Sequence, residues 1–219
     1  FSLMSGKHST SGGQGGMVLT NDEELYWNAK RFADRGKPFN SPIETNLFLG
    51  MNYRMTELQA VIGRVQLQKL PAIVEKRRAV VEMIRERIQD LEAIRLGRVI
   101  EDVKPSYWFL FLRVHPEKLR VPKEQVAAAL QAEGLPVAAS YAWVIPDMYW
   151  IRERKTYGES RCPWSCPYYG KEVRYDGQLP NAHLAREQHM TLAIHECYTE
   201  QECDDIARAL RKVERAYLK

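Results

Sequence analysis

The sequence lacks the features that would place the protein in or across a membrane. It has no stretch of about 18 consecutive apolar residues, the length that a bilayer-spanning helix needs, and no signal-peptide pattern. Internal repeats and low-complexity tracts are also absent from the 219 residues. We therefore expect a cytoplasmic globular protein with no membrane partner, built as one large domain or two small ones.

Cysteine is scarce, and the four cysteines do not predict a metal site. Cys162 and Cys166 have a spacing that zinc tolerates, but no second CxxC or HxxxH pair accompanies them to complete four ligands. The other two cysteines are Cys197 and Cys203. We expect four free thiols, as is usual in a reducing compartment, and no bound metal.

Neither sign of charge predominates. The chain has 32 Lys and Arg against 28 Asp and Glu, and the two signs are interleaved. This mixing is typical of a solvated surface and does not favour binding to nucleic acid. Aromatic residues at 107–109 could stack on bases, but their strand spacing beside Leu110 and Leu112 places them in the core instead.

The first third of the chain predicts a short strand and a helix. MVLT (17–20) is typical of a buried strand, and the residues after it form a helical pattern with Thr20 or Asn21 as N-cap. A Gly- and Pro-rich loop follows this helix. The buried stripe of the helix is expected to contain Leu25, Ala29 and Phe32.

A long helical pattern runs from Thr56 to about Leu91. Pro71 must end or kink it, because proline lacks the amide donor and clashes with the preceding turn, and we expect a second helix after it. The apolar residues of the first part are Leu58, Val61, Ile62, Val65 and Leu67. Those of the second part are Val74, Val81, Ile84 and Ile88.

The remaining residues predict a compact α/β domain, because helical and strand patterns alternate. Strands are expected at 107–112, 135–140 and 191–196, and an irregular stretch at 150–180. One helix is expected near 123–132, ended by Gly134. The last helix begins with a capping box of Thr199 and Glu202 and carries an apolar stripe of Ile206, Leu210, Val213 and Tyr217.

The segment FSLMSGKHSTSGGQGGMVLTND (1–22) carries the clearest chemical signal. A nucleotide-binding P-loop requires a glycine five residues before the Gly-Lys pair and Ser or Thr after the lysine. Phe1 and His8 occupy these two places. The P-loop interpretation therefore fails.

A second interpretation treats Lys7 as a nucleophile. A lysine amine with a lowered pKa attacks carbonyl carbons and forms a Schiff base. Ser2 supplies a hydroxyl that could bind a phosphate oxygen, and the glycines permit close backbone approach. These residues alone do not distinguish such a site from an ordinary surface loop.

The order of these motifs is similar to that of a known family. The Ser-x-x-x-x-Lys pattern, the Gly-rich turn and MVLTND resemble a signature of the DegT/DnrJ/StrS family of sugar aminotransferases. GMNYRMTELQAVIGRVQLQKL (50–70) resembles its second signature. The likeness continues through AEGLPVAASY (132–141) and LAIHECYTEQECDDIARALRKV (192–213), and so covers nearly the whole chain.

This resemblance implies the type I fold of enzymes that use pyridoxal 5′-phosphate (PLP). Residues 1–70 would form the C-terminal part of the large PLP-binding domain, and residues 71–219 the small C-terminal α/β domain. The implied reaction moves an amino group from glutamate or glutamine to a keto sugar nucleotide or a keto-cyclitol. The implied assembly is a homodimer.

The resemblance also assigns roles to residues. Lys7 matches the lysine that forms a Schiff base with PLP, and Ser2 matches the hydroxyl that binds the cofactor phosphate. Asn52 and Arg54 match a segment that reaches the phosphate and substrate region of the neighbouring subunit, which is why a homodimer is expected. Two residues fall in segments expected near the substrate, namely Tyr141 and His195.

Two departures from the family pattern concern the cofactor loop and the substrate. The family turn Gly-Glu-Gly-Gly is replaced by GGQGG, with Gln14 in place of the acid. Ser106 stands where a histidine is frequent, which suggests a different substrate. Related dehydratases have histidine at the position of Lys7, so the lysine favours transamination.

The N-terminal half of the family has no counterpart in these residues. That half supplies the carboxylate that pairs with the pyridine nitrogen and the side chain that stacks on the ring. We therefore expect the chain to be part of a longer enzyme, and the isolated chain to bind PLP weakly and not turn over. The alternative is a non-catalytic remnant that serves in dimerisation or regulation.

Overall fold

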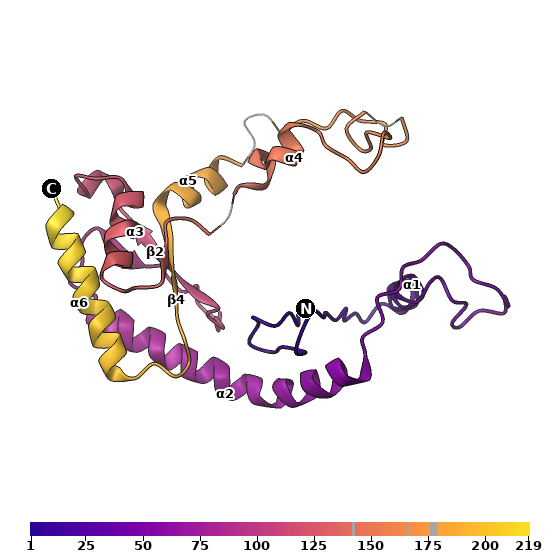
Figure 1. Ribbon diagram of the computed structural model, residues 1–219, viewed down its shortest axis with the longest axis horizontal. Helices are drawn as coiled ribbons and strands as arrows, with labels where there is room; N and C mark the ends of the chain where they lie inside the picture. The colour runs from indigo at the N-terminus through magenta and orange to yellow at the C-terminus, as the bar shows by residue number, and fades with distance from the viewer. Residues whose placement is uncertain (142, 166, 176–178) are drawn as a thin grey trace. The chain divides into compact units, whose positions relative to one another are not determined.

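The computed structural model describes residues 1–141, 143–165, 167–175 and 179–219, and its course is drawn in Figure 1. The chain forms two compact units, Phe1–Lys76 and Arg77–Lys219. Helix α2 (Glu57–Arg87) contains the boundary between them. In the part of the chain that is described, no helix has both the length and the apolar content to cross a bilayer.

Helix α1 (Glu23–Ala33) has Asp22 as its N-cap, one residue after Asn21 and two after Thr20, the two predicted N-caps. The Asp22 carboxylate accepts a hydrogen bond from the Leu25 amide at 2.9 Å, and acidic residues lie in the first turn and basic residues in the last. This charge arrangement complements the helix dipole. The predicted buried stripe is wrong, because no residue of α1 is buried and Phe32 is 46% exposed.

The predicted strand at 17–20 is also wrong. Met17 forms backbone hydrogen bonds with Phe1, but the next residues have no strand partner. Val18 and Leu19 are largely exposed. An apolar segment forms a β-strand only where a neighbouring strand can make backbone hydrogen bonds with it. The first unit provides no such strand here.

Helix α2 continues through Pro71, so the separate second helix that we expected does not exist. The loss of one amide donor is tolerated because good helix formers flank it on both sides. The apolar residues of its first part are exposed: Leu58, Val61, Ile62, Val65 and Leu67. In its second part Val81 and Ile84 are buried and Val74 is half-buried, and Ile88, just after the helix, is buried.

The second unit is built on one antiparallel sheet of four strands. The strands are β1 (Ile94–Leu96), β2 (Phe109–Val114), β3 (Val137–Ala138) and β4 (His189–Ala193), in the order β1-β2-β4-β3. Leu112 of β2 lies opposite Leu96 on one side and Met190 on the other. Alternate residues of β2 are buried, so one face of the sheet meets the core.

Helices α3 (Lys123–Ala132) and α6 (Glu200–Tyr217) complete the core. The predicted end of α3 is confirmed, with Gly134 at a positive φ of 90°. The capping box of Thr199 and Glu202 is also confirmed. The side chains that are fully enclosed by these elements include Ile84, Ile94, Leu112, Leu130, Met190, Leu192 and Leu210.

The other elements of this unit differ from the prediction in detail. Strand β1 and helix α5 (Pro180–Gln188) were not predicted, and β3 is shorter than expected. Helix α4 (Tyr149–Arg152) and two 3-10 helices, η1 (Pro116–Lys118) and η2 (Ile145–Asp147), are short. The aromatic residues at 107–109 lie at the edge of the core, and Trp108 is 38% exposed.

The expectation of four free thiols is wrong. Cys162 is disulfide-bonded, whereas Cys197 and Cys203 are free. Cys203 is buried in the core, and this burial raises the pKa of its thiol. Cys166 lies outside the described residues.

Arg77 joins α2 to the sheet. Its guanidinium donates to the carbonyl oxygens of Tyr107, Trp108 and Ile194 at 2.8, 2.8 and 2.9 Å, and to Glu196 Oε2 at 2.6 Å. Burial opposes ionisation of Glu196, but hydrogen bonds to its carboxylate and the charges of His195 and Arg77 outweigh it and lower its pKa. A buried charge that makes four hydrogen bonds fixes the register of the groups around it.

Two further buried charges hold the sheet at other points. The Glu214 carboxylate on α6 accepts the backbone amides of Glu92, Ala93 and Ile94 at 2.7–2.8 Å, which fixes the start of β1. The Lys123 ammonium donates to the backbone carbonyl oxygens of Ala139, Arg186 and His189. These residues lie after β3, in α5 and at the start of β4. Burial is the main cause of the lowered pKa of Lys123.

We predict that Arg77→Met lowers the free energy of unfolding by about 3 kcal/mol, because it leaves Glu196 and three carbonyl groups without their donor. Denaturant unfolding followed by circular dichroism measures this change. The matched control is Arg208→Ala, whose side chain is 72% exposed and whose loss should change the free energy by less than about 0.5 kcal/mol. Equal effects of the two substitutions would show that the Arg77 contacts do not stabilise this unit.

Candidate active site

Lys7 lies in the turn of a loop that closes on itself. Met17 N donates to Phe1 O at 2.9 Å, Leu3 N to Gly15 O at 2.8 Å, and Ser11 N to Leu3 O at 2.9 Å. The Lys7 amide donates to Met4 O at 3.0 Å, which makes the turn. The lysine is half-buried. These bonds define the cofactor loop, residues 1–17, and hold Lys7 at its tip.

Close packing inside the cofactor loop explains one of its glycines. Ser11 is fully buried, and its hydroxyl donates to Leu3 O at 3.1 Å. A Cβ on Gly15 would lie 2.4 Å from Ser11 Oγ and 3.3 Å from Met55 Cε. No side chain fits there without moving Ser11, so glycine is required for the loop to close.

Ser9 offers a polar group beside Lys7 that the chain itself does not satisfy. Its Oγ is buried and finds no hydrogen-bond partner among the residues that the structure describes. A buried hydroxyl without a partner is unusual and indicates a missing polar neighbour. The segment that carries Lys7 therefore suits a polar ligand such as PLP. Ser2 is exposed, and it lies opposite Gly16 in the paired part of the loop.

Gln59 connects the cofactor loop to α2, a role that the sequence analysis missed. Its side-chain amide donates to Gln14 O at 2.8 Å, and its Oε1 accepts the Thr56 amide at 3.1 Å. Thr56 Oγ1 accepts the Gln59 amide in return. This is a capping box at the start of α2 whose second member also holds the GGQGG turn. The Thr-x-x-Gln pattern at 56–59 is the sequence feature from which this capping box could have been predicted.

Asn52 and Arg54 lie together against the end of α1. The backbone of Met51 and Tyr53 bonds to Phe32 and Ala33, and Asn52 Oδ1 accepts from Arg54 Nε at 3.1 Å. Arg54 Nε is 3.5 Å from Asp34 Oδ1. The side chains of Asn52 and Arg54 thus lie together, and Asp34, which was not predicted from the sequence, lies beside them.

Asp34 carries a stabilised negative charge in this cluster. Burial of the carboxylate opposes its ionisation, but hydrogen bonds from Lys37 and Arg35 and the charges of Lys37 and Arg54 outweigh that effect. The pKa of Asp34 is therefore lower than its usual value. An ionised Asp34 holds Arg54 in a fixed orientation, so this guanidinium is positioned by its neighbours and is not a freely rotating side chain.

Tyr141 and His195 lie in the second unit, at separate places. The Tyr141 ring is 4.7 Å from that of Phe109, and its side chain is exposed. His195 is exposed in the segment after β4, where its Nδ1 accepts the Cys197 amide at 3.2 Å. The next residue is Glu196, the partner of Arg77. Their relation to a substrate stays a prediction.

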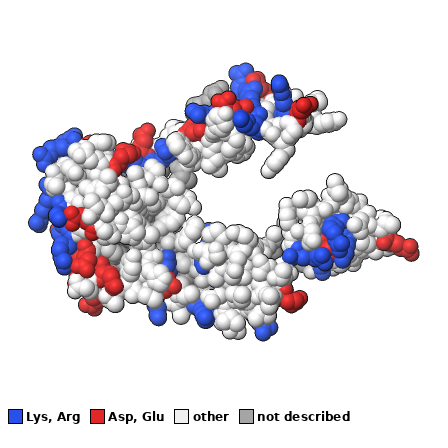
Figure 2. All heavy atoms as spheres, viewed as in Figure 1, with Lys and Arg blue, Asp and Glu red and all other residues white. Residues whose placement is uncertain are grey.

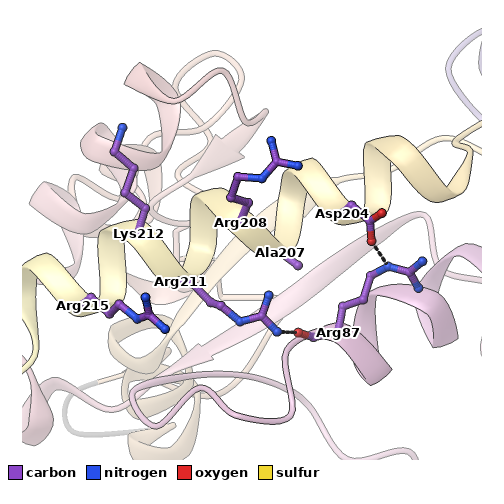
Figure 3. Close-up of a pocket in the computed structure, with 7 residues that line it drawn as sticks. All are labelled: Arg87, Asp204, Ala207, Arg208, Arg211, Lys212 and Arg215. Carbon is purple, nitrogen blue, oxygen red and sulfur yellow. Dashed lines mark hydrogen bonds and ion pairs between the residues drawn. The ribbon is translucent and has the colours of Figure 1, made fainter.

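A polar cavity of about 720 Å³ between α2 and α6 does not suit a ligand site (Figure 3). It is lined by five basic residues and one acid: Arg87, Asp204, Arg208, Arg211, Lys212 and Arg215. Arg87 pairs with Asp204 at 2.5 Å, and Arg211 binds Asp90 through two nitrogens at 2.7 and 2.9 Å. Acidic and basic atoms lie side by side over this part of the unit (Figure 2). Most of these cations are therefore neutralised within the chain.

Comparison with known proteins gives a family match and distant relatives. The family model described as the DegT/DnrJ/EryC1/StrS aminotransferase family matches residues 1–166. GDP-perosamine synthase of Escherichia coli O157:H7 is 31% identical over 50% of this chain and 29% of its own length. The dTDP-4-dehydro-2,3,6-trideoxy-D-glucose 4-aminotransferase of Saccharopolyspora spinosa is 24% identical over 91% of this chain and 48% of its own length.

Solved structures share the fold. The aminotransferase from Psychrobacter cryohalolentis matches with a TM-score of 0.74 and 26% identity, over 98% of this chain and 55% of that one. The predicted fold class, the C-terminal part of the type I PLP-dependent fold, is confirmed by such neighbours. The chain spans about half the length of the curated relatives that it matches over most of its length.

We predict that Gly15→Ala opens the cofactor loop, because the added Cβ would displace Ser11. Trypsin should then cleave after Lys7 several-fold faster than in the parent chain, as measured by mass spectrometry of the peptides. Gly13→Ala is the matched control, since its Cβ would lie 3.7 Å from Gln59 Nε2, an ordinary contact. If both variants are cleaved at the parental rate, Gly15 is not needed for closure.

Proposed function

Because the chain belongs to the DegT/DnrJ/EryC1/StrS aminotransferase family, we propose that it forms the C-terminal part of a PLP-dependent sugar aminotransferase. The enzyme moves an amino group from glutamate or glutamine to a keto sugar nucleotide or a keto-cyclitol. The observation that carries this proposal is the closed loop that presents Lys7 beside the unsatisfied hydroxyl of Ser9.

Lys7, Ser2 and Ser9 are the residues of this chain that we assign to the cofactor. Bound PLP supplies an aldehyde carbon that takes up the amino group and a ring that withdraws electrons from the reacting carbon. Lys7 would hold the cofactor covalently at that aldehyde through its unprotonated amine, with the aldehyde oxygen leaving as water. Ser2 Oγ donates a hydrogen bond to the phosphate, and Ser9 Oγ provides a further polar contact beside the lysine.

Lys7 also has a role after the amino donor has replaced it. Its unprotonated Nζ would then take a proton from one reacting carbon and return it to the other, so it would act first as base and then as acid. Such a group must be held in place, since proton transfer requires hydrogen-bond distance. The backbone bonds of the cofactor loop and the Gln59–Gln14 contact supply this positioning.

Asn52 and Arg54 contribute to the site of a second subunit in our proposal, which makes the active enzyme a homodimer. Support comes from the fixed geometry of the pair: Asp34 and Asn52 both hold Arg54 Nε. A guanidinium oriented in this way is suited to a phosphate or carboxylate group. Tyr141 and His195 are proposed near the substrate.

The chain contributes to two parts of the enzyme in this proposal. Residues 1–70 belong to the large cofactor domain and residues 71–219 form the small C-terminal domain. The first unit has an extensive exposed apolar surface, and α1 buries none of its residues. That exposure also favours the alternative function, a dimerisation unit without catalysis, so the two must be separated by experiment.

We predict that the natural protein, purified with PLP, shows a near-visible absorbance band that is lost in Lys7→Ala and in Lys7→Arg. Arginine keeps the positive charge but offers no amine for the aldehyde. Lys69→Ala removes an exposed lysine of α2 and should retain the band. A natural protein that shows no band at saturating PLP would support the non-catalytic alternative.

A further inference from the structure

A cavity of about 300 Å³ lies within the second unit and is lined by none of the residues assigned to the cofactor. The described residues around it come from η2, from α4 and the turn after it, from the chain between 164 and 175, and from α5. They include Asp147, Arg152, Arg154, Trp164, Tyr175 and His183. We call it the arginine cavity. Its volume is at the lower end of the range of small-molecule sites.

Buried apolar side chains give the arginine cavity a fixed wall. Ile151 and Trp164 are each 7% exposed, and the ring centres of Trp150 and Tyr175 lie 6.4 and 6.3 Å from that of Trp164. The Trp164 indole nitrogen donates to Lys155 O at 3.5 Å, in the turn that follows α4. The indole therefore packs against this turn, and the wall is in place before a ligand arrives.

Two arginines of the arginine cavity have no anionic partner within the described part of the chain. Arg152 and Arg154 line the cavity, and neither makes an ion pair or a side-chain hydrogen bond with another described residue. Arg174 also lines it but is engaged, because its Nε lies 2.8 Å from Glu172 Oε1. The hydrogen bond from Arg174 and the charges of Arg174 and Arg154 lower the pKa of Glu172. This acid is therefore ionised and balances one of the three arginines.

Asp147 is the one acid among the described residues that line the arginine cavity. Its Oδ2 lies 3.5 Å from Nδ1 of His183 on α5, and the two side chains are 40% and 41% exposed. The imidazole thus faces the carboxylate that would otherwise repel an anion. With His183 neutral, three arginines still stand against Asp147 and Glu172, so the surroundings of the cavity keep a net positive charge.

Arg154 occupies its position at a cost in backbone energy. Helix α4 ends in a Schellman motif, in which the Arg154 amide donates to Ile151 O at 3.0 Å and the Lys155 amide to Trp150 O at 2.8 Å. The motif requires a left-handed residue, and Arg154 has a φ of 49°. Glycine is usual there, because a Cβ is strained at positive φ. Strain of this kind is common where a side chain serves a ligand.

We propose that the arginine cavity binds a small dianion that carries a phosphate group or two carboxylates, held by Arg152 and Arg154 beside the Trp164 ring. Two cations in one short turn attract a doubly charged group more strongly than a single charge. Guanidinium groups bind phosphate and carboxylate oxygens alike through paired N–H donors. The inference goes beyond the proposed function and does not depend on it.

Calorimetry on the natural protein, saturated with PLP so that the cofactor phosphate site is filled, tests the proposal. The probes are inorganic phosphate, malonate and chloride at equal ionic strength. We expect phosphate or malonate to bind at millimolar concentration or below and chloride not to bind. Arg152→Gln and Arg154→Ala should each weaken this binding roughly tenfold, the loss of one charge-assisted hydrogen bond. Tighter binding of phosphate indicates a phosphate ester as the ligand, and tighter binding of malonate a dicarboxylate.

Arg154→Gly distinguishes a ligand-binding arginine from a structural one. It should weaken binding as Arg154→Ala does, yet slow hydrogen exchange at the Lys155 amide about fivefold, because glycine relieves the left-handed strain. Arg154→Ala keeps the strain and should not slow exchange. A purely structural arginine predicts faster exchange in both variants with unchanged affinity for the anions, and that result would overturn the proposal.

Arg161→Gly is the matched control. Arg161 is exposed, lies in the same segment and also has a positive φ, 52°, but it does not line the arginine cavity. Its loss should leave anion affinity unchanged. The proposal also fails if neither phosphate nor malonate binds at millimolar concentration, or if Arg152→Gln and Arg154→Ala bind them as tightly as Arg161→Gly. Such a failure would leave the Lys7 absorbance band, which tests the proposed function, unaffected.

Discussion

Arg77 donates hydrogen bonds to the chain just before β2 and just after β4, the two central strands of the sheet. Removing water from a guanidinium is costly, and the cost is offset only while Glu196 and the three carbonyl oxygens stay in place. The contact therefore ties α2 to both central strands at once. It also fixes the segment that carries His195, which follows β4 directly and lies between Ile194 and Glu196, two partners of Arg77.

Local sequence signals predicted two helices of the second unit well, α3 and α6, because each of these depends on neighbouring residues. The apolar period and the Thr199–Glu202 capping box located α6, and Gly134 located the end of α3. Strand β1 could not be found this way, since its start is fixed by Glu214, about 120 positions away, which accepts the amides of Glu92, Ala93 and Ile94. The continuity of α2 through Pro71 likewise depends on the helix around it and not on proline itself.

In the candidate site, too, short sequence motifs could be recognised, whereas contacts between residues far apart in the sequence could not. Its motifs identified Lys7, Ser2, Asn52 and Arg54, because these residue types occur in a recognisable order. The residues that hold them were not predicted, since the contacts join distant positions: Gln59 bonds to Gln14, and Asp34 to Arg54. The predicted strand at 17–20 failed for a related reason, as its apolar residues have no strand partner within this unit.

Covalent trapping tests the role of Lys7 most directly. Borohydride reduction of the natural protein with bound PLP converts the linkage between a lysine and the cofactor into a stable secondary amine, which peptide mass mapping then locates. The account predicts a pyridoxyl group on the peptide that contains Lys7 and on no other peptide of this chain. A pyridoxyl group on a different lysine, with Lys7 unmodified, would contradict it.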